Sequence, residues 1–176
     1  DWTPMRAGRL NRVLFGHDLE RIWMAGAACQ AVALPERLLL PRFRALFREL
    51  VRFGYDRRKG GFFEWGQMGE PVEKRQKTWW VQAEALVTSA YLYSLTGDQI
   101  YGLAFLETLD WVLRHQVDWE YGDWHAYLDP RGSPQALKAS AIKTPYHNGR
   151  SMLMCLEFLD ALEAGRFGRR EHAFDV

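Results

Sequence analysis

Two long connections between helical segments constrain the fold of this chain more than any other feature of its sequence. The first covers about residues 55–77 and the second about residues 118–146, and both are longer than the loops that usually join helices in a compact domain. They also resemble each other, because Gly132 follows Gly69, and Pro134 follows Pro71, by 63 residues. Each connection is predicted to form a short aromatic hairpin that turns at a glycine and returns to the next helix.

Apolar residues at helical spacing predict the rest of the fold. They cover the segments 18–34, 36–53, 78–95, 99–117 and 148–162. A repeat made of two antiparallel helices and a hairpin, about 60 residues long, is the unit of an α/α toroid. We therefore expect an all-α chain whose hairpins gather on one face around a central pocket.

Composition describes one soluble globular domain and excludes several classes of function. The chain has 176 residues, and its 23 Lys and Arg balance 22 Asp and Glu, which argues against nucleic acid or an anionic membrane as partner. The longest nearly uncharged stretch, residues 24–34, is shorter than a membrane span. Two cysteines are too few for a secreted disulfide scaffold, so we expect a cytoplasmic protein. The first residue is Asp1, which leads us to expect a processed or truncated start.

Two polar groups at helix starts are candidates for chemistry. His17 and Glu20 are three residues apart and share a helix face; they form either a functional pair or an ordinary N-terminal charge arrangement that favours the helix dipole. His147 begins the last helix and has two similar interpretations. It belongs either to a capping segment with Asn148 as N-cap, or to a site that needs close approach at Gly149.

A third candidate lies on the predicted third helix, where Trp80 and Glu84 share a face at i and i+4. An indole beside a carboxylate suits a sugar, because the ring stacks on the C–H face while the acid accepts hydroxyl hydrogen bonds. The same spacing is also typical of a core. The sequence has no paired-cysteine motif, no histidines at i and i+4, and no Gly-rich phosphate loop. We expect no metal and no cofactor, and metal-free acid–base chemistry by histidine is the leading option.

Four motifs occur in an order that resembles the N-acylglucosamine 2-epimerase superfamily, which includes the cellobiose 2-epimerases. They are 16–23 (GHDLERIW), 77–85 (KTWWVQAEA), 122–124 (GDW) and 143–150 (KTPYHNGR). The similar region covers about residues 11–160, and residues 165–176 form a polar tail. The resemblance implies an (α/α)6 barrel. It also implies that residues 1–176 form one domain, the C-terminal half of that barrel.

The resemblance further implies an isomerase, either a carbohydrate 2-epimerase or an aldose–ketose isomerase. Such an enzyme acts without a metal at C2 of a reducing aldose of the N-acylglucosamine, mannose/glucose or cellobiose type, through a cis-enediolate. His17 and His147 correspond to the acid/base pair, a task for which imidazole is suited because its unperturbed pKa is about 6.5. Glu20 is expected to orient His17. The residues that the resemblance places around the sugar are Glu20, Trp80, Glu84 and Trp124.

Two other functions remain open at this point. A glycoside hydrolase or lyase on the same toroid would need two facing carboxylates, for which Glu20 and Glu84 are the candidates. A non-catalytic sugar-binding or interaction remnant would expose the aromatic surface of an open half-barrel. The expected partners are the sugar substrate and either the missing N-terminal half or a second copy across the open barrel.

Overall fold

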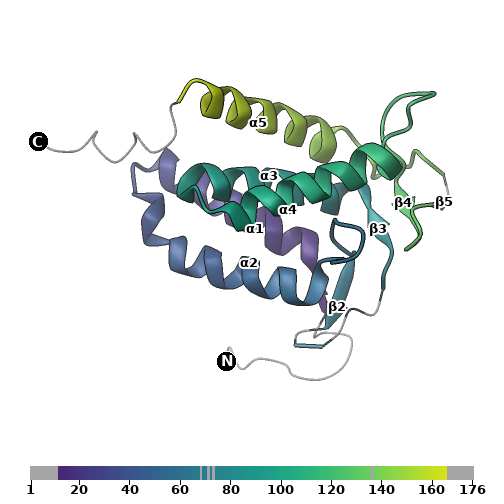
Figure 1. Cartoon of the computed structure of the whole chain (residues 1–176), viewed down its shortest axis with the longest axis horizontal. Helices are drawn as coiled ribbons and strands as arrows, with labels where there is room; N and C mark the ends of the chain where they lie inside the picture. Colours follow the sequence, from purple (N-terminus) through teal and green to yellow (C-terminus); the bar gives the residue numbers. More distant parts are fainter. Residues whose placement is uncertain (1–11, 68, 71, 73, 136, 166–176) are drawn as a thin grey trace, which may run out of the picture.

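The computed structural model describes residues 12–67, 69–70, 72, 74–135 and 137–165. Helices dominate, and short strands gather at one end of the molecule (Figure 1). In chain order the elements are β1 (Arg12–Leu14), α1 (Phe15–Ala31), η2 (Glu36–Leu38), α2 (Leu40–Gly54), β2 (Trp65–Gln67), β3 (Lys77–Thr78), α3 (Trp79–Thr96), α4 (Gln99–Trp111), η3 (Val112–Gln116), β4 (Tyr127–Leu128), β5 (Pro134–Gln135) and α5 (Tyr146–Glu163).

The predicted all-α architecture is confirmed, and the helices form two sets. Helices α1, α3 and α5 all begin at the end where the strands lie, whereas α2 and α4 run back in the opposite direction (Figure 1). Helix α3 packs against α1, α4 and α5. It is buried on all sides over most of its length, which is typical of a central helix. The start of α3 is therefore surrounded by other elements and can contribute to a site shared by several helices.

The internal repeat is visible in how the two connections are anchored. In the first, the ammonium of Lys77 binds the Asp56 carboxylate at 2.9 Å and the Gly60 carbonyl at 2.5 Å. In the second, Lys138 binds the Asp118 carboxylate at 2.7 Å and the carbonyl of Gly122, which has the position of Gly60 in the first repeat, at 2.8 Å. Each aspartate also accepts two backbone N–H bonds from the residues that follow it. The same Lys–Asp–Gly anchor thus holds both hairpins.

Strand pairing repeats in the same way. The strand before α1 pairs with the hairpin that follows α2, with Leu14 opposite Trp65. The strand before α3 pairs with the hairpin that follows α4, with Thr78 opposite Tyr127. Each pairing brings the start of α1 or α3 against the hairpin that closes the same repeat. The two hairpins therefore lie beside the N-terminal ends of α1 and α3.

Two hydrophobic clusters form the core, one mainly between α1, α2 and α3 and the other between α3, α4, α5 and the second hairpin. Polar side chains of α3 also tie the layers together. The Gln82 amide bonds both the N–H and the C=O of Phe62, at 2.9 and 2.6 Å. The two cysteines are free, and no helix in the described part of the chain has both the length and the hydropathy of a membrane span.

The helix boundaries differ from the predicted ones mainly at three starts. Helix α2 begins at Leu40, four residues after the predicted start, because Glu36–Leu38 form the separate 3-10 turn η2. Helix α1 begins at Phe15, three residues before the predicted start, so the site residue His17 lies inside its first turn. Helix α5 begins at Tyr146. Asn148 is therefore a first-turn residue and not the N-cap, and its amide donates to the Asp123 carboxylate at 2.9 Å. The predicted tail lies outside the described residues, apart from residue 165.

Candidate active site

Three aromatic residues predicted from separate motifs meet at the start of the central helix. His17 lies in the first turn of α1, Trp80 in that of α3 and His147 in that of α5. The ring centroids of His17 and Trp80 are 5.0 Å apart, and those of His147 and Trp80 are 5.5 Å apart. The three helices begin at one end of the molecule (Figure 1). The structure therefore places two imidazoles against one indole.

A glycine makes this close approach possible. A Cβ atom on Gly16 would lie 2.2 Å from Cζ3 of the Trp80 ring, a distance that no side chain can occupy without moving the indole. The glycine next to His17 therefore serves the packing of α1 on α3. Any larger residue would displace the ring that both histidines contact.

Glu84, one turn below Trp80, is fully buried and organises the site. One carboxylate oxygen, Oε1, contacts Nδ1 of His147 at 2.6 Å, and the other, Oε2, accepts from the Trp23 indole N–H at 2.8 Å. Since a carboxylate only accepts hydrogen bonds, it holds the proton on Nδ1 and leaves Nε2 of His147 for a substrate. The predicted contact between Glu84 and a sugar would have to compete with these protein donors.

Arg150 supplies a positive charge between two carboxylates. Its guanidinium binds Glu84 Oε1 and lies 3.8 Å from Glu20 Oε1. It also lies over the rings of Tyr146 and Trp23, at 4.3 and 4.5 Å. The Tyr146 hydroxyl accepts from Arg150 at 3.2 Å and donates to Glu20 at 3.5 Å. Glu20 thus contacts residues of α5, and its expected role in orienting the histidine of α1 stays a prediction.

One group of possible metal ligands occurs among the described residues. Glu20, Glu84 and His147 each offer an atom, and these atoms lie within 4.8 Å of one another. The Arg150 guanidinium already contacts one of the carboxylates and lies near the other. The Arg150 guanidinium therefore supplies a positive charge next to both acids.

Trp124, the remaining predicted site residue, is a core residue. It is 7% exposed and packs in the second core cluster, and its backbone pairs with Val117. Its counterpart in the first hairpin is Phe62, which pairs with Tyr55 and is also buried. Since this position faces the core in both repeats, the structure supports a packing role. The expectation that Trp124 lines a sugar site stays a prediction.

Three residues of the cluster were not among the predicted site residues, namely Trp23, Tyr146 and Arg150. Their spacing was a usable signal. Trp23 is three residues after Glu20, and Arg150 is three after His147 and four after Tyr146, so each shares a helix face with a predicted residue. What spacing does not reveal is that these two helix faces meet across Glu84.

The fold and the site together define the class of protein. The chain is part of a helical toroid of the kind found in carbohydrate isomerases, and histidines and carboxylates lie at the starts of its inner helices. The chain belongs to the N-acylglucosamine 2-epimerase family, whose model matches residues 1–151. This membership confirms the resemblance seen in the four sequence motifs.

Individual relatives agree with the family. The chain is 29% identical to human N-acylglucosamine 2-epimerase over 160 residues, which cover 84% of this chain and 35% of that protein. It is 31% identical to D-mannose isomerase from Marinomonas mediterranea over 129 residues, covering 73% of this chain and 32% of the relative. The solved cellobiose 2-epimerase from Spirochaeta thermophila superposes with a TM-score of 0.75 at 30% identity, covering 93% of this chain and 40% of that one. The chain therefore spans about a third of the length of the curated relatives.

Proposed function

We propose that this chain carries the acid–base residues of a metal-free sugar 2-epimerase or aldose–ketose isomerase, with His17 and His147 as the pair. The observation that carries the proposal is the contact of both imidazoles with one indole, Trp80. The Glu84 carboxylate behind His147 adds to it, because it leaves Nε2 as the reacting atom. This pairing of a histidine with a buried carboxylate follows the logic by which a triad orients its imidazole.

The proposed reaction balances with protons alone. One imidazole removes the proton from C2 of the open-chain aldose, and the bond electrons move onto the carbonyl oxygen to form a cis-enediolate. The other imidazole, protonated, returns a proton to the opposite face of C2 and gives the epimer. Return of a proton to C1, with transfer of the O2 hydroxyl proton to O1, gives the ketose. The starts of α1, α3 and α5 point their positive dipole ends towards this site, which favours the enediolate anion.

The proposed substrate is a free reducing aldose. The names of the relatives include an N-acylglucosamine 2-epimerase, a D-mannose isomerase and a cellobiose 2-epimerase, so sugars of these three types are the ones to test. Trp80 is proposed to stack on the sugar ring. We also propose, from the order of the motifs, that these residues form the C-terminal half of a toroid and that the part of the longer relatives that this sequence does not match would complete the site.

Loss of the C2 proton in deuterated water tests the proposal. Mannose, N-acetylmannosamine and cellobiose are each incubated with this chain, alone and together with the segment of a longer relative that it does not match, and the C2–H signal is followed by NMR. We expect His17→Asn and His147→Asn each to slow exchange by at least about 100-fold, because each removes one acid–base group.

A matched control and a contrary result complete this experiment. His115→Asn changes a histidine whose ring contacts Trp111, away from the site residues, and should leave exchange unchanged. If exchange continued at the original rate in both site variants, the two-histidine mechanism would be wrong. Release of a shorter sugar from a glycoside would instead favour the hydrolase. The geometry supports the hydrolase less, because Arg150 contacts Glu84 and lies near Glu20, whereas that reaction needs two carboxylates facing a glycosidic bond.

A further inference from the structure

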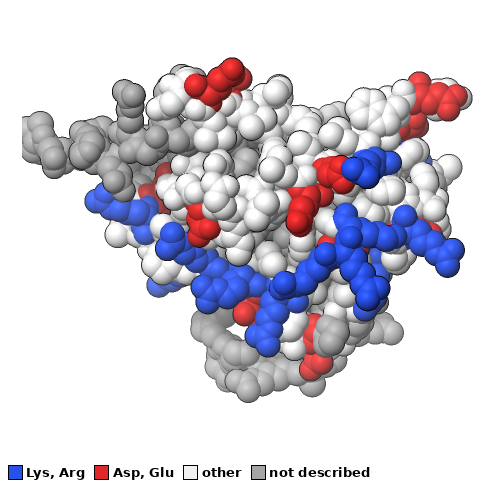
Figure 2. Space-filling view, viewed as in Figure 1, with Lys and Arg blue, Asp and Glu red and all other residues white. Residues whose placement is uncertain are grey.

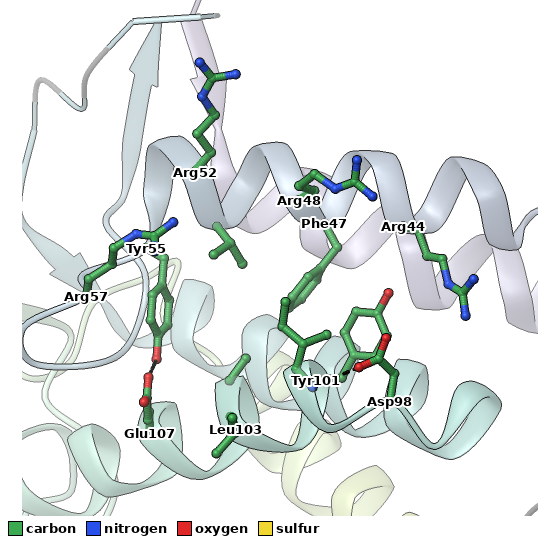
Figure 3. Close-up of a pocket in the computed structure, with 13 residues that line it drawn as sticks. Arg44, Phe47, Arg48, Arg52, Tyr55, Arg57, Asp98, Tyr101, Leu103 and Glu107 are labelled. Atoms are coloured by element: carbon green, nitrogen blue, oxygen red, sulfur yellow. Dashed lines mark hydrogen bonds between the residues drawn. The ribbon is translucent and has the colours of Figure 1, made fainter.

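A groove outside the histidine cluster runs between α2 and α4 (Figure 3). Its volume is about 770 Å³, and none of the residues that line it belongs to the candidate active site. The lining residues come from α2, from the turn after it and from α4 with its N-cap. The groove is therefore a separate surface feature.

The α2 side of the groove is basic. Arg44, Arg48 and Arg52 line it at i, i+4 and i+8, and Arg57 lies beyond the end of the helix. In Figure 3 the Arg44 side chain points towards α4, whereas the Arg52 side chain points away from it. At 1.5 Å of rise per residue the three helical arginines span about 12 Å. Figure 2 shows Lys and Arg side chains gathered in a band across this face of the molecule, although the whole chain has a net charge of only +1.

The α4 side is apolar in its middle and acidic near its ends. Ile100 and Leu103 line the groove although they are 55% and 57% exposed. Asp98 precedes them, and Glu107 follows them one turn later, where its carboxylate accepts a hydrogen bond from Tyr55. A ligand in this groove would meet a row of positive charge on one side and exposed aliphatic surface on the other.

We propose that this groove binds an amphipathic acidic helix of a partner protein. A helix carrying Asp or Glu at i, i+4 and i+8 matches the spacing of Arg44, Arg48 and Arg52, and a leucine stripe beside these acids would cover Ile100 and Leu103. Burying an apolar helix face in a groove between two helices is a common mode of recognition. The basic side supplies the charge complementarity that selects the partner and its register.

Other anionic partners match the groove less well. A polyphosphate or a nucleic acid would leave the aliphatic side uncovered and would meet the carboxylates of Asp98 and Glu107. A flat anionic membrane surface does not enter a concave groove. The mixed character of the two sides therefore selects a ligand that is acidic on one face and apolar on the next.

A fluorescent peptide tests the proposal with the whole chain. The probe is a designed helix of about 15 residues, long enough to form in a bound state, with Glu at i, i+4 and i+8 and Leu along the adjacent stripe. Fluorescence anisotropy measures its binding. We expect Arg48→Glu and Leu103→Ser each to weaken binding by about ten-fold or more, and raising the salt concentration to weaken it in the unaltered chain.

Each variant has a matched control. Arg42→Glu alters an exposed arginine of α2, and Leu106→Ser an exposed leucine of α4; neither residue lines the groove, so both should bind the probe like the original chain. A scrambled peptide of identical composition should bind at least about ten-fold more weakly. The proposal is overturned if the scrambled peptide binds equally well, if Arg42→Glu weakens binding as much as Arg48→Glu, or if sodium triphosphate displaces the probe at an ionic strength at which sodium chloride does not.

Discussion

Glu84 is the residue on which the candidate site depends. It is fully buried, and a buried carboxylate costs free energy unless charge and hydrogen bonds compensate for it. Here the compensation comes from three side chains of two other helices: Trp23 of α1, and His147 and Arg150 of α5. Glu84, a side chain of α3, therefore links the start of α5 to α1 and α3, the other two helices that begin at this end of the molecule.

Removing the arginine should expose this dependence. Arg150→Met removes the guanidinium that compensates the buried Glu84 carboxylate, so we expect the free energy of unfolding to fall by about 3 kcal/mol. Adding Glu84→Gln to that variant removes the uncompensated charge and should restore part of the loss. Urea unfolding of the single and double variants, followed by circular dichroism, measures both effects. Losses that simply add in the double variant would show that the two side chains are not coupled.

The hairpins and the helices that begin beside them depend on the Lys–Asp anchors. Lys77 is fully buried, with its ammonium 3.5 Å from the centre of the Trp111 ring. Burial lowers the pKa of Lys77 to about 8, although the neighbouring Asp56 carboxylate acts in the opposite direction. The anchor thus ties the first hairpin to the start of α3 while holding a charge out of water.

This lowered pKa predicts how stability changes with pH. In the unfolded chain Lys77 returns to its ordinary pKa of 10.5, so between pH 8 and 10.5 the unfolded state binds more protons at this residue than the folded state. The contribution of Lys77 to the free energy of unfolding therefore rises with pH across this window. Urea unfolding at several pH values should show a steeper rise for the original chain than for Lys77→Met. Parallel curves would mean that the pKa of Lys77 is not lowered by folding.

The part of the chain that the structure describes has exposed apolar edges. Helix α5 packs on α3 with one face, while Leu153 and Leu156 on another face are 65% and 57% exposed. Helix α1, on the other side of α3, exposes Met24. Apolar surface that is exposed on opposite edges of one layer of helices is typical of a segment that packs against another segment or chain. The solved cellobiose 2-epimerase extends well beyond the matched region.

We expect these edges to make the chain associate with itself when no other segment covers them. Sedimentation velocity at rising concentrations should show species larger than a monomer. Leu153→Lys combined with Leu156→Lys should shift the distribution towards monomer, because charged side chains resist burial in an apolar contact. Leu113→Lys, at an exposed position at the end of the α4 segment, serves as the control. A chain that stays monomeric at every concentration would contradict this expectation.

Much of the local structure follows from the order of the residues, because helices and hairpins depend on neighbours in the chain. Apolar spacing predicted the five α-helices, and the matched Gly-Pro pairs predicted the two hairpins. The pairing of His17 with Glu20 on one face, and of Trp80 with Glu84 on another, follows from helical geometry alone. The four motifs also identified the family correctly.

Packing between helices settled which of these residues meet. Glu84 and His147 are 63 residues apart in the chain, yet they are in hydrogen-bond contact because α3 and α5 start at the same end. The same packing brings Arg150 to Glu84 and buries Trp124 in the core. The 3.6-residue period of a single helix determines which of its side chains share a face. Contacts between faces depend on how three helices pack together, which no local pattern encodes.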